Sequence, residues 1–109
     1  MTVLQWNVQG IRSKLDVLTA VLDSDQVDVA LLQETNLPAT HKLTFRRYVY
    51  HNLPVVQGET RGLGILVKRS IAHSLVADPI DCGEGVEVMA VTIQLSGTPL
   101  TLYNIYRKP

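Results

Sequence analysis

The chain has 109 residues, enough for one domain with a modest core. Hydrophobic residues make up 46% and charged residues 18%, which is typical of a folded protein and excludes a disordered chain. The net charge of zero provides no general basic field for nucleic acid, and no apolar run approaches the roughly 20 residues of a membrane span. The lone Cys82 fits a reducing compartment, so we expect a soluble, intracellular protein with no membrane partner.

A strand, a helix and a second strand are predicted at the beginning of the chain. The apolar run at 3–6 predicts a strand, and leucines and valines at helical spacing predict a helix at 14–23 with Ser13 as its N-cap. A continuous aliphatic run at 27–32 predicts a strand that is buried on both faces. This order is typical of a βαβ unit, whose strands are parallel and end at the same edge of a sheet.

Polar side chains follow both of these strands. Asn7 comes directly after the first apolar run, and Glu34 follows the second. Because open α/β sheets place their ligands at the carboxyl ends of parallel strands, we expect the amide and the carboxylate to lie close together. Oxygen ligands of this kind suit a hard cation such as Mg²⁺. The sequence therefore indicates the beginning of a metal-dependent site.

The later part of the chain predicts strands joined by loops. Aliphatic or alternating runs lie at 48–50, 63–67, 86–95 and 100–106. Residues 57–62 predict a flexible connection, and residues 96–99 predict a tight hairpin between the last two strands. We expect one mixed, mostly antiparallel sheet with the helix on one face.

Four short motifs follow one another along the chain: Trp6-Asn7-Val8-Gln9-Gly10, Leu32-Gln33-Glu34-Thr35, Arg61-Gly62-Leu63-Gly64-Ile65-Leu66-Val67 and Tyr103-Asn104-Ile105-Tyr106. In this order they resemble the motifs of the endonuclease/exonuclease/phosphatase superfamily. Each motif alone is weak, but four at the family spacing are specific. The variant resembles the endonuclease domain at the start of non-LTR retrotransposon polyproteins, and the resemblance covers only the N-terminal half of that domain.

This resemblance implies an α/β (α+β) fold, namely half of a four-layer α/β sandwich. Residues 1–109 are then a partial domain whose C-terminal half is missing. In the family, two packed sheets carry helices on their outer faces, and we expect the second sheet to come from the missing half. One face of the sheet in this chain should then be partly uncovered, which is a liability for aggregation or partner binding.

The resemblance also implies roles for individual residues. Glu34 is similar to the family's metal ligand, and Asn7 is similar to the asparagine that orients catalytic groups beside the metal. Tyr106 matches the tyrosine whose phenol approaches the scissile phosphate, and Arg107 is a candidate for binding substrate phosphate. The implied cofactor is Mg²⁺ or Mn²⁺.

Other side chains are expected to have structural or surface positions. Tyr103 lies three residues before Tyr106, so on an ideal strand the two point to opposite faces, and Tyr103 is the better core candidate. His41, His51 and His73 lie in loops or at loop edges without a suitably spaced carboxylate, and we expect all three at the surface.

The leading functional hypothesis is an N-terminal fragment of a divalent-metal-dependent endonuclease that nicks target DNA for retrotransposition. DNA and a downstream reverse-transcriptase region would be its partners, and the nucleus would then be its location. An alternative is a phosphomonoesterase of the same superfamily that acts on a sugar or lipid phosphate. Another is a non-catalytic remnant that only folds or binds. The family's Asp-His pair is absent, so we expect the fragment alone to be inactive.

Overall fold

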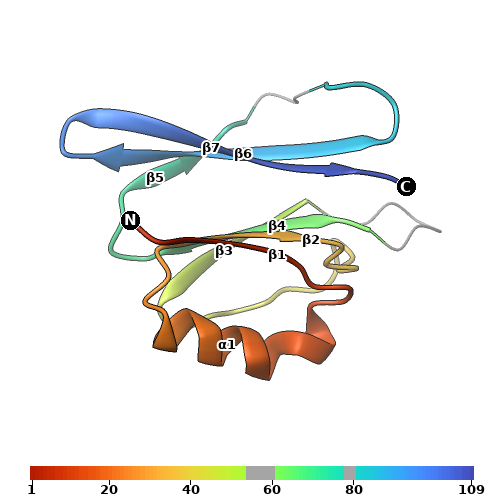
Figure 1. The fold of residues 1–109 in the computed structure, drawn as a ribbon, viewed down its shortest axis with the longest axis horizontal. Helices are drawn as coiled ribbons and strands as arrows, with labels where there is room; N and C mark the ends of the chain where they lie inside the picture. The colour runs from red at the N-terminus through yellow and green to blue at the C-terminus, as the bar shows by residue number, and fades with distance from the viewer. Residues whose placement is uncertain (54–60, 78–80) are drawn as a thin grey trace.

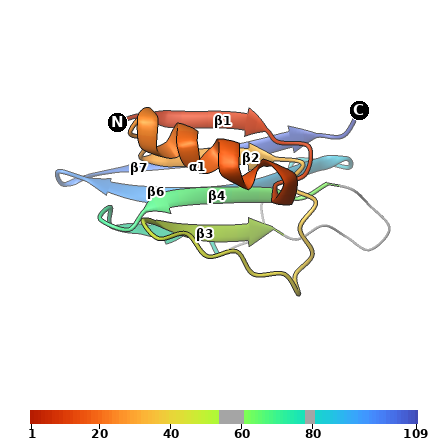
Figure 2. The same ribbon diagram turned by 90° about the horizontal axis from the view of Figure 1, so that it is seen from below.

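Two β-sheets pack face to face, and one helix covers the outer face of the first sheet (Figures 1 and 2). The structure is a computed structural model that describes residues 1–53, 61–77 and 81–109. Of the predicted connection at 57–62, residues 57–60 lie outside the described residues. The elements are β1 (Val3–Asn7), a 3-10 helix η1 (Arg12–Lys14), α1 (Leu15–Ser24), β2 (Val29–Gln33), β3 (Tyr48–Leu53), β4 (Leu63–Lys68), β5 (His73–Leu75), β6 (Val86–Leu95) and β7 (Thr98–Arg107).

The first sheet has the strand order β1-β2-β4-β3. Its first pair is parallel, with Asn7 beside Gln33, and its other two pairs are antiparallel. The βαβ unit at the beginning of the chain is therefore confirmed. All five residues of β2 are buried, because α1 covers one face of this strand and the second sheet covers the other.

The helix α1 packs against the first sheet through Leu18 and Leu22, which are buried with Ala30 and Leu32 of β2. The predicted N-cap is wrong. Lys14 occupies the cap position without a side-chain bond, and the Ser13 hydroxyl donates to the Gly10 carbonyl instead. The chain enters the helix through η1. Ile11 is buried and its amide N–H donates a hydrogen bond to the Thr35 carbonyl, so the first turn forms from that point.

The second sheet has the order β5-β6-β7, and it corrects the expectation of a single sheet. Leu95 pairs with Thr98, so the β6–β7 hairpin turns on two residues, Ser96 and Gly97, both with positive φ. The inner side of the hairpin, including Val91 and Ile93, packs on buried side chains of β2 and β4. The chain therefore covers the inner face of the first sheet with its own second sheet, and the expectation that this cover comes from elsewhere in the family domain is wrong.

Among the described residues, no helix or sheet covers the outer face of the second sheet. Tyr103 and Ile105 lie on it, and each is 55% exposed. The prediction of Tyr103 as a core residue is wrong, because the inward positions of β7 are Leu102, Asn104 and Tyr106. The opposite orientation of Tyr103 and Tyr106 is confirmed. Within the described residues, no helix is long and apolar enough to cross a bilayer.

Candidate active site

Two polar side chains meet where the parallel strands end. Asn7 is the last residue of β1, and Glu34 directly follows β2. The Asn7 Nδ2 atom donates a hydrogen bond of 2.9 Å to Glu34 Oε2. The structure therefore confirms that the amide and the carboxylate lie together at one edge of the sheet.

The backbone at Glu34 adopts a left-handed conformation with a φ of +52°. A non-glycine residue reaches this region only when its surroundings hold it there. The Glu34 carbonyl accepts a 2.8 Å bond from the Gly10 amide, and the next amide, that of Thr35, donates 3.1 Å to the Gly62 carbonyl. The loop after β1 and the residues before β4 thus hold the backbone at Glu34 from both sides.

Tyr106 reaches the same carboxylate from the second sheet. Its hydroxyl donates a 2.7 Å hydrogen bond to Glu34 Oε2, across 72 residues of sequence. Asn7, Glu34 and Tyr106 therefore form one cluster, although they come from three strands and two sheets. Within the part of the chain that the structure describes, both of these hydrogen bonds fall on Oε2 and none falls on Oε1. The second oxygen is the one left for another ligand.

The charges in the cluster are set by these bonds. The hydrogen bond from Asn7 lowers the pKa of Glu34 most, followed by the bond from Tyr106 and by the attraction of the Arg61 guanidinium. The bond to Glu34 in turn raises the pKa of the Tyr106 phenol. At neutral pH the site therefore presents a charged acceptor beside a neutral hydroxyl donor.

Arg61 is a residue of this site that the sequence interpretation did not single out. It lies two residues before β4, and its positive charge lowers the pKa of both Glu34 and Tyr106. Its place in the third motif was the available signal. Arg107, by contrast, is exposed at the end of β7 and follows Tyr106, so its side chain leaves the strand on the opposite face. The structure does not bring Arg107 into the cluster, and its role in binding phosphate stays a prediction.

The side chains fit a sparse cation site. Mg²⁺ keeps several waters and usually binds through one or two carboxylates plus substrate phosphate. Glu34 offers one carboxylate oxygen, and among residues 1–53, 61–77 and 81–109 no group of three His, Cys, Asp or Glu side chains gathers to hold a metal. This donor set suits a weak hard-cation site that water and phosphate complete.

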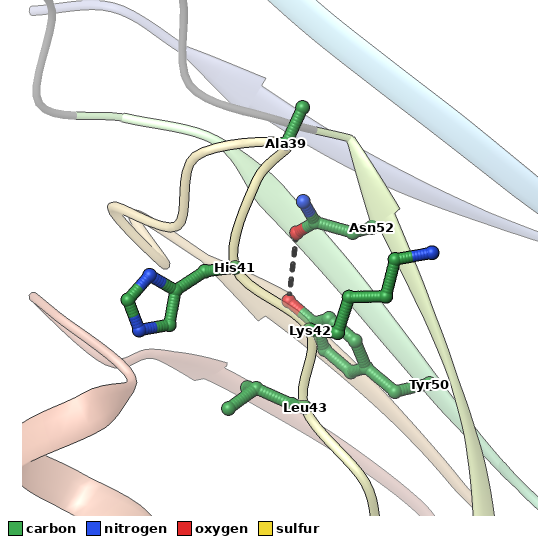
Figure 3. Close-up of a pocket in the computed structure, with 6 residues that line it drawn as sticks. All are labelled: Ala39, His41, Lys42, Leu43, Tyr50 and Asn52. Atoms are coloured by element: carbon green, nitrogen blue, oxygen red, sulfur yellow. Dashed lines mark hydrogen bonds between the residues drawn. The ribbon is translucent and has the colours of Figure 1, made fainter.

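A separate hollow of about 270 Å³ lies over β3 and the loop before it (Figure 3). Its lining residues are Ala39, His41, Lys42, Leu43, Tyr50 and Asn52. The Tyr50 hydroxyl donates a 3.0 Å bond to Asn52, and its ring lies so close to Gly64 that a Cβ there would meet it. This contact explains the second glycine of the third motif. The cluster of Asn7, Glu34 and Tyr106 does not line the hollow.

Two of the three histidines are not surface residues. His41 is exposed as expected, but His51 and His73 are half-buried and face each other between the sheets, with their Nε2 atoms 2.9 Å apart. Nδ1 of His73 lies 3.0 Å from the Ile71 carbonyl, which can only accept, so a neutral His73 accepts at its Nε2 a hydrogen bond that His51 Nε2 donates. The expectation failed because β5, which brings His73 to this place, is too short to show a sequence pattern.

Comparisons with known proteins agree with this fold. The model of the endonuclease/exonuclease/phosphatase family matches residues 4–102. A solved AP endonuclease from Leishmania major superposes with a TM-score of 0.73 at 19% identity, and the likeness covers 95% of this chain and 39% of that structure. No match was found among curated protein sequences. The chain spans about two fifths of that solved structure, and by its family match it belongs to the endonuclease/exonuclease/phosphatase family of hydrolytic enzymes.

Proposed function

We propose that this chain is the N-terminal part of a divalent-metal-dependent endonuclease that hydrolyses DNA phosphodiester bonds. The observation that carries the proposal is the shared acceptor at Glu34, whose Oε2 takes hydrogen bonds from Asn7 and Tyr106 while Oε1 takes none within the described residues. A carboxylate held in this way is pre-organised to present its other oxygen to a cation. The same arrangement places a neutral donor, the Tyr106 hydroxyl, beside the carboxylate.

Each residue then has a distinct part in the chemistry. A bound Mg²⁺ or Mn²⁺ supplies charge stabilisation on the phosphoryl oxygens. Glu34 would hold the cation through Oε1, while the hydrogen bond from Asn7 fixes the carboxylate at Oε2. The Tyr106 phenol, which stays protonated at neutral pH, would turn its single proton from Glu34 Oε2 to a phosphate oxygen as charge builds on that oxygen. Arg61, whose positive charge acts on Glu34, would add to the attraction for a phosphate at this site.

The parent protein on this proposal is a retrotransposon polyprotein that nicks target DNA, with a reverse-transcriptase region after the endonuclease domain. The motif order supports this source, and the fold likeness to an AP endonuclease is compatible with cleavage of a DNA strand. A phosphomonoesterase would use the same cluster, so the substrate has to be tested directly. We expect the general base to come from the part of the family domain that follows these residues.

The test compares the 109-residue chain with the complete domain of its parent gene, on supercoiled plasmid with Mg²⁺ or Mn²⁺. The complete domain should nick the plasmid, the shorter chain should show negligible nicking, and Glu34→Gln should abolish the activity of the complete domain. Glu84→Gln is the matched control, because Glu84 is an exposed residue of the turn before β6. Faster turnover of a phosphomonoester than of plasmid would favour the alternative, and unchanged nicking by Glu34→Gln would reject the site.

A further inference from the structure

A pair of buried amides lies directly behind the cluster. Gln33 is 4% exposed and Asn104 is 1% exposed, although both side chains are fully polar at their tips. Gln33 Nε2 donates a 2.6 Å hydrogen bond to Asn104 Oδ1. Since Gln33 belongs to β2 and Asn104 to β7, this bond crosses from one sheet to the other. We call these two residues the amide tie.

The surrounding carbonyls fix the orientation of the amide tie. Asn104 Nδ2 donates to the carbonyls of Leu32 at 2.9 Å and Gly64 at 3.0 Å, and carbonyls can only accept. Asn104 must therefore turn its Oδ1 toward Gln33, and Gln33 must donate to that oxygen with its Nε2. The remaining Gln33 oxygen accepts a bond from the Gln5 side chain. Because every polar atom of the tie has a partner, only one arrangement of the two amides satisfies them all.

Burying two hydrogen-bonded amides contributes little net free energy to folding, because the amides lose their hydrogen bonds to water. Around the amide tie, the contact between the sheets is mostly apolar, with Val29, Ile65 and Val91 among its buried members. Apolar contact is non-directional, so it tolerates small sliding of one sheet over the other. Hydrogen bonds at fixed lengths and angles do not tolerate it. The amide tie therefore sets the offset between β2 and β7 at this end of the molecule.

The amide tie is adjacent to the cluster on both strands. Gln33 immediately precedes Glu34, and Asn104 lies two residues before Tyr106 on the same face of β7. We propose that Gln33 and Asn104 are positioning residues, whose bond holds β7 against the end of β2 so that the Tyr106 hydroxyl meets Glu34 Oε2. The catalytic importance of that contact rests on the proposed function, whereas the positional claim does not.

The positional claim can be tested on the 109-residue chain. The variants are Asn104→Leu, Gln33→Met and the double substitution. The matched control is Ile93→Ala, because Ile93 is buried between the same sheets but lies outside the amide tie. Tyrosine labelled at Cζ reports on the phenol by NMR, with Tyr106 assigned through Tyr106→Phe. Tyr103, which is 55% exposed, gives the signal of a water-exposed phenol in the same spectrum.

We expect the Tyr106 signal to move toward that of Tyr103 in all three tie variants and to stay in place in Ile93→Ala. The double variant should regain part of the lost thermal stability, because neither Gln33 nor Asn104 is then left as an amide without its partner, as each single variant leaves one of them. It should nevertheless keep the displaced Tyr106 signal, which a purely structural role would not produce. If Asn104→Leu does not fold, Gln33→Met carries the same test with nearly unchanged side-chain length. An unmoved Tyr106 signal in a folded tie variant, or an equal movement in Ile93→Ala, would overturn the proposal.

A kinetic measurement on the complete domain separates this proposal from the proposed function. There the tie variants should lower kcat on the order of tenfold or more with little change in KM, because displacement of a positioned group slows the step without weakening substrate binding. Ile93→Ala should keep kcat. A complete wild-type domain without nuclease activity would end the proposed function, while the Tyr106 signal would still decide the positional claim.

Discussion

Replacing Glu34 by Gln should separate the two functions of its side chain. Both known donors, Asn7 Nδ2 at 2.9 Å and the Tyr106 hydroxyl at 2.7 Å, need an acceptor at the place of Oε2. The Gln amide therefore has to put its oxygen there and its NH₂ group at the place of Oε1. An NH₂ group cannot bind a cation, so the variant keeps the shape of the cluster and loses the metal ligand.

The expected magnitudes follow from this geometry. A hydrogen bond to a charged group contributes about 1.5–3 kcal/mol and a neutral one about 0.5–1.5, so two bonds would lose roughly 2 kcal/mol. Because the cluster is only partly buried, solvent screening should reduce the loss in folding free energy to about 1 kcal/mol. A cation contributes several kcal/mol of charge stabilisation, and each 1.4 kcal/mol is tenfold in rate, so turnover should fall on the order of a hundredfold or more.

The assays are urea unfolding of the 109-residue chain and initial nicking rates of the complete domain over a range of Mg²⁺ concentrations. DNA binding, measured without nicking in the absence of Mg²⁺, should change little, since the substitution leaves the basic side chains in place. Similar nicking rates for wild type and Glu34→Gln at saturating Mg²⁺ would refute the assignment of Glu34 as the ligand.

Three further substitutions or conditions have defined outcomes. Tyr106→Phe removes one hydroxyl donor and should slow nicking less than Glu34→Gln does, because a hydrogen bond to a charged oxygen contributes about 1.5–3 kcal/mol, less than the charge stabilisation that a cation supplies. Burial is the larger cause of a lowered pKa of His51, and the nearby His73 lowers that pKa further. The folded protein therefore favours neutral His51. That contribution to stability is present above the ordinary pKa of 6.5 and is lost as the pH falls through the folded-state pKa. The thermal midpoint should therefore fall with acidification, and His73→Gln should change this pH dependence. A midpoint that does not depend on pH would contradict the pairing of the two histidines. Gly64→Ala should lower the free energy of urea unfolding by about 1–3 kcal/mol, because the added methyl group meets the Tyr50 ring, and a neutral effect would show that the ring can move away.

Local patterns in the sequence were sufficient for the elements around Asn7 and Glu34. The continuous aliphatic run of β2 predicts burial on both faces, and the structure confirms it. Parallel pairing of β1 and β2 then brings the two polar residues to one edge, whatever the rest of the chain does. The alternation in β6 and β7 likewise predicts the hairpin, because cross-strand pairs share a face.

The placement of that hairpin could not be predicted in the same way. Alternation shows that one face of β6 and β7 is apolar, but it does not show whether the hairpin extends the first sheet or packs across it. That choice depends on contacts between Val91 or Ile93 and residues of β2 and β4 that are distant in sequence. The same limit applies to Arg61, whose charge matters only because the entry to β4 passes beside Glu34. The error on Ser13 has a different origin, since Ile11 is buried and the helix begins through a tighter turn.

The central claim is that Glu34 binds a divalent cation. Its most direct test is to locate the binding site of a paramagnetic divalent ion on the folded chain. Mn²⁺ broadens NMR signals of nuclei close to it, and its preference for oxygen ligands resembles that of Mg²⁺. In a titration of the 109-residue chain, the signals of Glu34, Asn7 and the Tyr106 ring should broaden first, and Glu34→Gln should remove this effect while Glu84→Gln should not. Equal broadening of the Asn7 and Tyr106 signals in Glu34→Gln, or broadening confined to other acidic residues such as Glu84, would contradict a cation site at Glu34.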